Sequence, residues 1–241
     1  MLTNKLFKQM KEHFLKAVEI DPLFSKAHFE LALVYNSDGN DDSEENHLYE
    51  SIKLDLAKIE ENKRFINKYL EKYQFQNAKF LINKNQEIKI DCSFSFYNLY
   101  SLYMRQKKIN KAKKQLIKSI ELNSSFSKSH RDLGILFYKE KKKDIAEQYL
   151  DLALNLNFGD YKSHYYFGMI MKEKSDYKQA EIHFLTSLDI KQNFLLCLME
   201  MANIKLLMND NDKAIIFYKK AKYFSKDIYN SKLEKLINSG K

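Results

Sequence analysis

The sequence contains few residues that interrupt helices. Proline occurs once, at Pro22, and glycine five times in 241 residues. Proline breaks helices because it lacks a backbone N–H and its ring clashes with the preceding turn, and glycine weakens them. Tryptophan is absent, so Tyr and Phe must supply the large aromatic packing. With 44% hydrophobic residues the chain is not disordered, and its composition favours an all-α protein.

Cysteine and long apolar runs are scarce as well. The only cysteines are Cys92 and Cys197. Two isolated thiols are typical of a reducing compartment, so we expect a cytoplasmic protein without a disulfide. No stretch approaches 18 apolar residues, so we expect no membrane span. The N-terminal segment lacks a continuous apolar core and a small-residue cleavage site, and we expect no signal peptide.

The charge balance is positive, with 41 Lys and Arg against 32 Asp and Glu and a formal net charge of +9. Such a balance favours acidic partners, which include acidic peptides, nucleic acid and anionic lipid. Lysine-rich composition also arises from codon usage without any partner, and the sequence leaves both explanations open.

An internal repeat organises the chain. Segments 127–160 and 161–194 have the same length of 34 residues and align without a gap, so that Gly134 matches Gly168. Self-similarity at a period of this size is typical of stacked repeat proteins. Extending the frame in both directions defines six windows: 25–58, 59–92, 93–126, 127–160, 161–194 and 195–228.

Small and large residues recur at fixed positions of this frame. Alanine, which lets two helices cross closely, recurs as Ala78, Ala112, Ala146, Ala180 and Ala214. Large apolar residues on a buried face recur as Leu48, Ile82, Leu116, Leu150, Phe184 and Tyr218. Neither helix of a pair could bury its apolar stripe alone, so the pairs must stack.

The period and these positions resemble the tetratricopeptide repeat (TPR) family over residues 3–228, most closely at 93–221. The resemblance implies an α-solenoid of stacked antiparallel helix pairs in a right-handed superhelix. It also implies a non-enzymatic protein–protein interaction scaffold that binds a peptide or partner segment in a concave groove.

Three regions depart from the regular frame. Residues 1–24 hold one helix, about 3–20, without its partner, so we expect self-association at this edge or continuation in a longer chain. Residues 229–241 are expected to form a capping helix and tail. Window 59–92 is degenerate, because it has Asn85 at a packing position and no turn residue where it begins. Either a single helix runs through about 45–72, or the segment NQEIKIDC is an irregular linker.

Catalytic and metal-binding motifs are missing. The chain has no Gly-rich phosphate loop, HExxH or GxSxG, so we expect neither an enzyme nor a cofactor. The acidic turn around Gly39 does not have EF-hand spacing. The histidines favour packing over ligation, because several share repeat positions: His28, His130 and His164 at one, His47 and His183 at another.

The resemblance also implies which residues line the groove, because first helices do so in TPR proteins. Aromatic and Met side chains interleaved with Lys and Arg suit an acidic or aromatic-containing peptide. The expected residues are Lys63, Asn67, Phe94, Tyr97, Asn98, Arg105, Lys128, Arg131, Tyr138, Lys162, Tyr165, Tyr166 and Met169, preceded in the first window by Lys26, Phe29 and Glu30.

Two alternatives differ in the ligand. In a co-chaperone-like carboxylate clamp, Lys63, Asn67, Asn98 and Lys128 would converge on an acidic C-terminal peptide, although Asp132 stands where that motif needs Arg. A basic nucleic-acid-binding repeat is the other alternative. It is supported by net charge alone, since RNA-reading helical repeats use a polar code at set positions that this chain lacks.

The repeat frame makes a direct prediction about packing. Ala146→Leu and Ala180→Leu each overpack a close helix crossing, and each is expected to lower the free energy of unfolding by about 1–3 kcal/mol. Thermal melts followed by circular dichroism measure the effect. If both variants melt like the wild type, the assigned frame is wrong.

Overall fold

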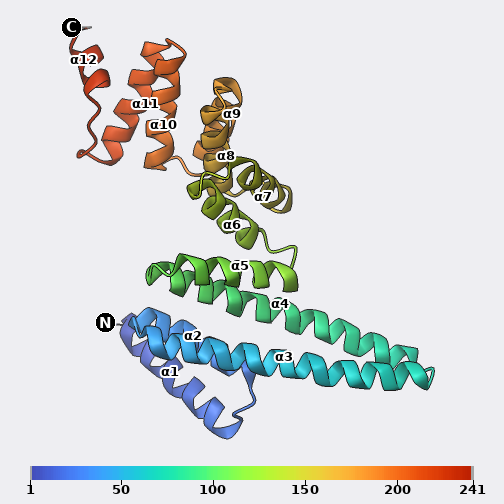
Figure 1. The fold of residues 1–241 in the computed structure, drawn as a ribbon. Helices are drawn as coiled ribbons and strands as arrows, with labels where there is room; N and C mark the ends of the chain where they lie inside the picture. The colour runs from blue at the N-terminus through green and yellow to red at the C-terminus, as the bar shows by residue number, and fades with distance from the viewer. Residues whose placement is uncertain (1, 240–241) are drawn as a thin grey trace. The chain divides into compact units, whose positions relative to one another are not determined.

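The computed structural model describes residues 2–239 and the side chains of residues 8–238. Every regular element in that part of the chain is an α-helix (Figure 1). The helices are α1 (Leu2–Ile20), α2 (Ser25–Asp38), α3 (Asp41–Glu71), α4 (Phe75–Arg105), α5 (Ile109–Leu122), α6 (Ser127–Lys139), α7 (Lys143–Leu156), α8 (Tyr161–Glu173), α9 (Tyr177–Ile190), α10 (Leu195–Leu207), α11 (Asn211–Phe224) and α12 (Ser231–Ser239).

The chain divides into two compact units, Met1–Ser129 and His130–Lys241. Within each unit successive helices pack side by side as antiparallel neighbours (Figure 1). The recurring alanines are buried at these crossings, among them Ala112, Ala146 and Ala180 at 0% exposure. Gly168 is required for the same reason, because a Cβ there would lie 2.7 Å from the Phe184 ring. The all-α repeat architecture is therefore confirmed.

One left-handed residue recurs in every turn between the two helices of a repeat. Gly39 has φ of 69°, and the equivalent residues at intervals of 34 are Tyr73, Lys107, Lys141, Ser175 and Asn209, with φ between 56° and 64°. Only the first of these residues is a glycine. In the other five, the Cβ atom makes the left-handed conformation strained. Because Tyr73 belongs to the series, window 59–92 keeps the turn between its two helices.

The turns between successive repeats are not all present. Four-residue turns occur at 21–24, 123–126, 157–160 and 191–194, but the equivalent residues 55–58 and 89–92 are helical. The second helix of window 25–58 therefore continues as the first helix of window 59–92 and forms α3. In the same way α4 continues into window 93–126. The predicted boundaries after residues 58 and 92 lie inside helices.

This continuity decides between the two alternatives for window 59–92. The single long helix through 45–72 is confirmed, because α3 spans Asp41–Glu71. The irregular linker at 85–92 is wrong, because that segment lies within α4. The local sequences explain the outcome: the missing turns are DLAK and KIDC, without Pro, Gly or Asn, whereas the others are DPLF, NSSF, NFGD and KQNF.

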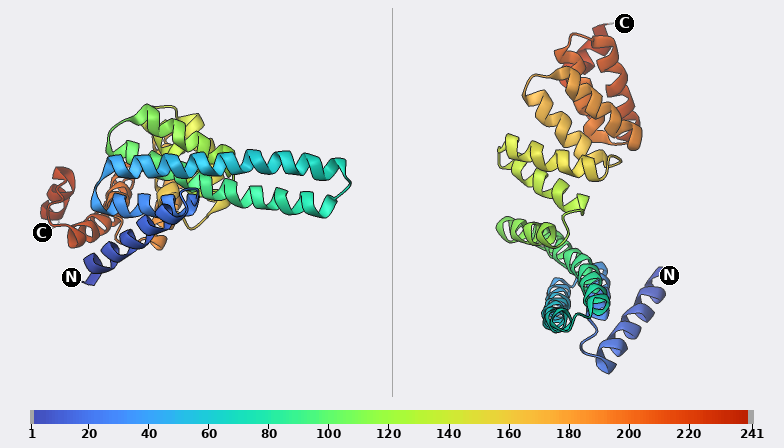
Figure 2. Two further views of the ribbon diagram at one scale, coloured as in Figure 1. Left: turned by 90° about the horizontal axis from the view of Figure 1, so that it is seen from below. Right: turned by 90° about the vertical axis from the view of Figure 1, so that its right-hand side faces the viewer.

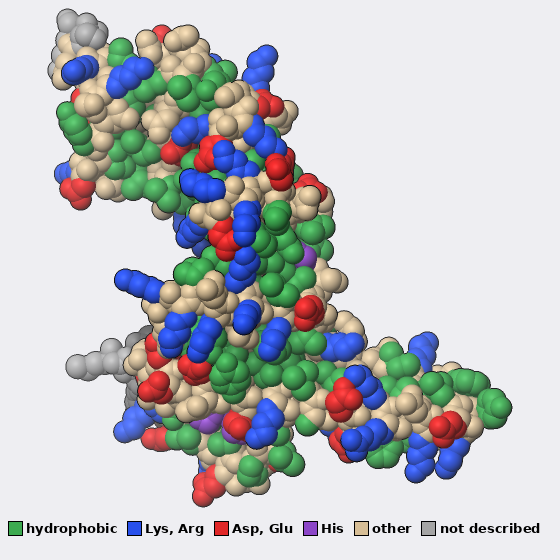
Figure 3. All heavy atoms as spheres, viewed as in Figure 1, with side chains coloured by type: hydrophobic (Ala, Val, Ile, Leu, Met, Phe, Trp, Pro, Cys, Tyr) green, Lys and Arg blue, Asp and Glu red, His purple; other side chains and the backbone are tan. Residues whose placement is uncertain are grey.

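The result is a hairpin of two 31-residue helices that extends well past α1 and α2 (Figure 2). Its far end buries only a thin seam, in which the Asn62 amide donates to Asn85 at 2.7 Å. Phe65, Tyr73 and Phe80 are exposed there. In Figure 3 hydrophobic, Lys and Arg side chains gather over this end.

The second unit contains α6 to α12 and keeps the regular frame. Lys205 stands at a repeat position where four earlier windows have an aromatic residue and one has Met171. Its ammonium group is buried beside Glu181 at 2.6 Å. Helix α12 lies within the predicted cap, where Leu233 is fully buried. None of the helices described is long and apolar enough to span a membrane.

The left-handed turn residues generate a stability prediction. Lys141→Gly relieves a positive-φ conformation and is expected to raise the free energy of unfolding by about 1 kcal/mol. The matched control Lys219→Gly, on an exposed face of α11, is expected to lower it by about 1 kcal/mol. Urea denaturation measures both, and equal destabilisation by the two glycines would contradict the argument.

Candidate partner-binding groove

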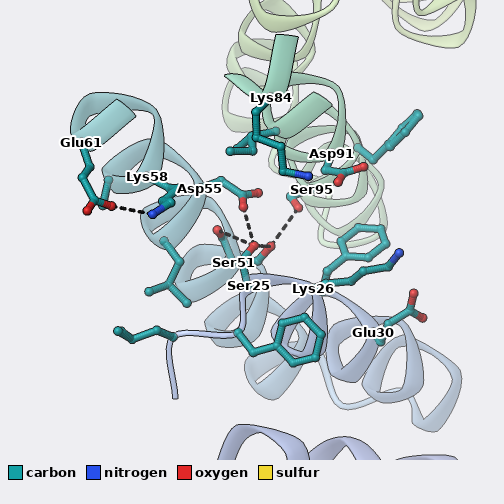
Figure 4. Close-up of a pocket in the computed structure, with 17 residues that line it drawn as sticks. Ser25, Lys26, Glu30, Ser51, Asp55, Lys58, Glu61, Lys84, Asp91 and Ser95 are labelled. Carbon is teal, nitrogen blue, oxygen red and sulfur yellow. Dashed lines mark hydrogen bonds and ion pairs between the residues drawn. The ribbon is translucent and has the colours of Figure 1, made fainter. Parts of the chain in front are cut away.

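A groove opens in the first unit between the start of α2, the middle of α3 and the middle of α4 (Figure 4). It encloses about 640 Å³, enough space for several side chains of a ligand. Its walls are mainly apolar and consist of Leu23, Phe24, Phe29, Leu54, Ala57, Ile88 and Phe94.

The groove lies where the turns at 55–58 and 89–92 are missing, since Asp55, Lys58 and Asp91 line it. In a regular repeat the helix that begins at residue 59 would turn back and pack beside α2. Here it runs straight on as the second half of α3. The second half of α4 packs there instead, with Cys92 and Phe96 in one buried cluster with Ala32 of α2 and Leu48 of α3. The groove lies beside this contact, where α3 and α4 extend past the start of α2.

Three serines and one carboxylate form the polar floor (Figure 4). The Ser25 hydroxyl donates to Asp55 Oδ1 at 2.5 Å. Ser51 Oγ lies 3.3 Å from Ser25 Oγ and 3.3 Å from Ser95 Oγ. Because the Ser25 hydroxyl already donates its hydrogen bond to Asp55, the Ser51 hydroxyl can donate to Ser25, and the Ser95 hydroxyl can donate to Ser51. This order directs every hydroxyl dipole toward the carboxylate.

Asp55 occupies a repeat position that elsewhere begins a turn. At that position the side-chain oxygens of Asn123 and Asn157 accept from the N–H two residues on, at 3.2 and 3.1 Å. Helix α3 continues through Asp55, so this backbone partner does not exist. The carboxylate is left at the groove floor with 8% of the residue exposed.

The electrostatic state of Asp55 follows from this position. Burial raises the pKa of its carboxyl to about 6, because the charged form loses hydration. The Ser25 hydrogen bond lowers the pKa and the Asp91 carboxylate raises it, and both effects are smaller than that of burial. Asp55 is therefore charged at neutral pH at the expense of folding stability.

Two of the lysines that line the groove form ion pairs on their own helices. Lys58 binds Glu61 at 2.7 Å, and Lys84 binds Glu87 at 2.9 Å. The complete set lining the groove is Lys26, Lys58 and Lys84 against Glu30, Asp55, Glu61 and Asp91. The groove is thus not basic, in contrast to the chain as a whole.

The structure brings some predicted groove residues together here. Lys26, Phe29, Glu30 and Phe94 all line the groove. Other predicted residues of the first unit have structural partners. Tyr97 packs against Phe126 with ring centroids 5.1 Å apart, and the Asn98 amide donates to the Phe94 carbonyl. Arg105 binds the buried Glu44 at 2.5 Å, and Lys128 is exposed.

The four clamp residues are not brought together. Lys63 and Asn67 lie exposed on the far half of α3, and Lys63 binds Glu60 at 2.5 Å. Lys63 follows Asn62, which marks its level along the hairpin because Asn62 pairs with Asn85 of α4. On α4, Asn98 lies 13 residues beyond Asn85. This separation is about 20 Å. The straight course of α3 therefore excludes convergence on one carboxylate.

The predicted residues of the second unit form a separate aromatic group. Tyr138 and Tyr166 pack with centroids 5.6 Å apart, and Tyr165 and Tyr166 at 5.1 Å. Met169 is half-buried against the core of this unit, and Lys162 is exposed. Arg131 is held by Asp132 at 2.7 Å and Asp160 at 3.5 Å. Its guanidinium is consequently already neutralised.

Histidines also pair within repeats. Nδ1 atoms lie 3.0 Å apart in His28–His47 and 3.1 Å apart in His164–His183. Burial lowers the pKa of His183 to about 4, and its neighbour His164 contributes. Neutral rings that donate and accept from each other fulfil a packing role. Among the described residues no group of three or more His, Cys, Asp or Glu could hold a metal ion.

Sequence reasoning missed the residues that make the groove distinctive. These are the floor residues Ser25, Ser51, Asp55 and Ser95, and the wall residues Leu54 and Ile88. One signal was available: an Asp stands at a turn position inside a segment, DLAK, that lacks any turn-forming neighbour. Taken with the long-helix alternative, it indicates an acidic side chain on a continuous helix.

Comparisons with known proteins concern the fold. No protein-family model and no curated protein matches the chain. Among solved structures, BtubC (BKLC) from P. vanneervenii is 14% identical at a TM-score of 0.63, covering 94% of this chain and 92% of that one. YrrB, described as a TPR protein with an unusual peptide-binding site, is 16% identical at 0.56, covering 90% and 94%. PilF of Pseudomonas aeruginosa is 16% identical at 0.55, covering 90% and 97%.

The state of Asp55 generates a stability prediction. The pKa of Asp55 is about 6 in the folded protein and 3.8 in the unfolded chain. The contribution of Asp55 to the free energy of unfolding therefore falls as the pH rises from 3.8 to about 6, and it is constant above pH 6. At pH 7 Asp55→Asn is therefore expected to raise the free energy of unfolding by about 1–3 kcal/mol. At pH 4 the gain should nearly vanish.

Urea denaturation at the two pH values measures this difference. The control Asp227→Asn removes an exposed carboxylate and is expected to change stability by less than about 0.5 kcal/mol. Destabilisation by Asp55→Asn at pH 7 would contradict the account.

Proposed function

Because the chain has the fold of tetratricopeptide repeat proteins, we propose that it is a non-enzymatic protein-interaction scaffold of the cytoplasm. Its first unit binds an apolar segment of a partner protein in the groove between α2, α3 and α4. The observation that carries this proposal is the mainly apolar groove between the start of α2 and the middle parts of α3 and α4.

The composition of the groove supports a protein segment as its occupant. Leu54, Phe29 and Ile88 are half-buried on its walls, and Leu23 and Phe24 are 74% and 47% exposed at its edge. Apolar surface of this kind is stabilised when a partner covers it. A groove of about 640 Å³ holds a few residues of a peptide or one face of a helix. The likeness to YrrB, whose description names a peptide-binding site, agrees with this use of the fold.

The non-enzymatic and cytoplasmic parts of the proposal rest on the chemistry of the thiols. Burial raises the pKa of Cys92 and of Cys197 to about 12, so neither is a nucleophile at neutral pH. Both cysteines are free and buried. Unpaired thiols suit a reducing compartment.

The test uses a photoreactive residue in the groove. Benzoylphenylalanine replaces Leu54, and as a control it replaces Tyr223, which is 84% exposed in the second unit. Irradiation in the source cells is expected to give a discrete adduct from position 54 and none of that mass from position 223. Adding Ile88→Lys, which places a charge on the opposite groove wall, should abolish the adduct.

Quantitative confirmation uses the partner identified in that adduct. Calorimetry with the purified proteins is expected to show at least about tenfold weaker binding to Ile88→Lys than to the wild type. A melting temperature equal to that of the wild type ensures that the variant is folded. Unchanged affinity, or adducts that do not depend on the groove, would refute the proposal.

A further inference from the structure

The floor of the groove holds a carboxylate that is buried but only half satisfied. Asp55 is 8% exposed, and Oδ1 accepts from Ser25 at 2.5 Å. The other oxygen has no hydrogen-bond partner among the described residues. Figure 4 shows it pointing away from Ser25, toward the side of the groove where Lys84 and Asp91 stand. A ligand in the groove can therefore reach this oxygen.

Among the described residues no Lys or Arg forms an ion pair with Asp55, and Lys58 and Lys84 are bound to Glu61 and Glu87. The nearby Asp91 carboxylate adds a second negative charge to the same side. A charge removed from water is costly unless it is paired, so the floor favours a cationic ligand group.

The walls specify what carries that cation. Leu54, Ile88 and Phe94 surround the approach to the floor. Lysine and arginine side chains bury an apolar stem and end in a cation. In this groove the stem would lie along the apolar walls, and the terminal N–H groups would donate to the free carboxylate oxygen. Hydrogen bonds between two charged groups are the strongest that proteins form.

We propose that Asp55 determines the specificity of the groove by binding a Lys or Arg side chain of the partner segment. This inference rests on the proposed function, since it names the chemistry of the segment that the groove binds. It differs from what the net charge of the chain suggests, which is an acidic partner. The bound segment is apolar and carries a basic residue at its centre.

Small probes isolate this chemistry from the unknown partner. The probes are 3-phenylpropylammonium, 3-phenylpropanol and 3-phenylpropionate, which differ only in the charge of the terminal group. Their affinities are measured at pH 7.5 by NMR titration of the isotope-labelled full chain. The ammonium is expected to bind about tenfold more tightly than the alcohol, because a charged hydrogen bond replaces a neutral one. The carboxylate probe should bind most weakly.

Variants assign the preference to Asp55. In Asp55→Asn the ammonium is expected to bind as weakly as the alcohol, while the affinity of the alcohol is unchanged. A general loss of structure would weaken both probes together. The control Glu61→Gln removes a carboxylate of the exposed rim that already binds Lys58. In that variant the tenfold preference should remain.

The preference should also depend on pH. It is expected to disappear as the pH falls through about 6 and Asp55 becomes protonated. The other charged groups that face the groove are Lys26 and Glu30 from α2, Lys58 and Glu61 from α3, and Lys84 and Asp91 from α4. The transition should be absent in Asp55→Asn, which keeps all of these groups and so assigns it to Asp55.

Each remaining outcome has a defined meaning. Equal affinities of ammonium and alcohol in the wild type would overturn the proposal and leave the groove as a purely apolar binding surface. Absence of binding by every probe, with the photoadduct at position 54 still formed, would also overturn it. Spermidine is tested as a final probe, because it is a polyamine without an apolar ring. If it binds as tightly as 3-phenylpropylammonium, the ligand is a free polyamine and the proposed side-chain contact is wrong.

Discussion

The uninterrupted backbone hydrogen bonding of α3 and α4 through residues 55–58 and 89–92 is the constraint on which the first unit depends. Every other inter-repeat position in the described chain forms a turn. Where the helix continues, two repeats become one hairpin. The same event lengthens α3 and α4, and the groove lies between their middle parts and the start of α2.

The continuity of helix α3 also changes the role of the Asp55 side chain, although its position in the repeat is the same as that of Asn123 and Asn157. Asn123 and Asn157 use their side-chain oxygens to close a turn. Asp55 has the equivalent position on a helix, where no turn N–H is available, and its charge remains buried at the groove floor. A carboxylate buried in this way weakens folding, because its charged form has lost hydration.

Net charge and local charge have separate consequences in this protein. The formal charge of +9 acts over the whole surface and predicts attraction to acidic partners. At the groove, however, the nearest charges determine which ligand charge is favoured. A buried carboxylate would attract a cation in contact with it more strongly than exposed lysines would repel that cation across solvent. Two of the rim lysines, Lys58 and Lys84, are also paired with Glu61 and Glu87.

The sequence by itself determined the repeat period, the helix pairs and their close crossings. These depend on local propensity and on small residues such as Ala146 and Gly168, whose spacing is visible in one dimension. It also raised the long helix as one of two alternatives and placed Phe29 and Phe94 in a groove. Only the tertiary structure decided that the helix runs through Asp55, and that Lys63 lies far from Asn98. The physical reason is that a helix and a turn differ little in free energy over four residues such as DLAK. Packing against α2 and α4 selects between them, and a sequence pattern contains no record of that packing.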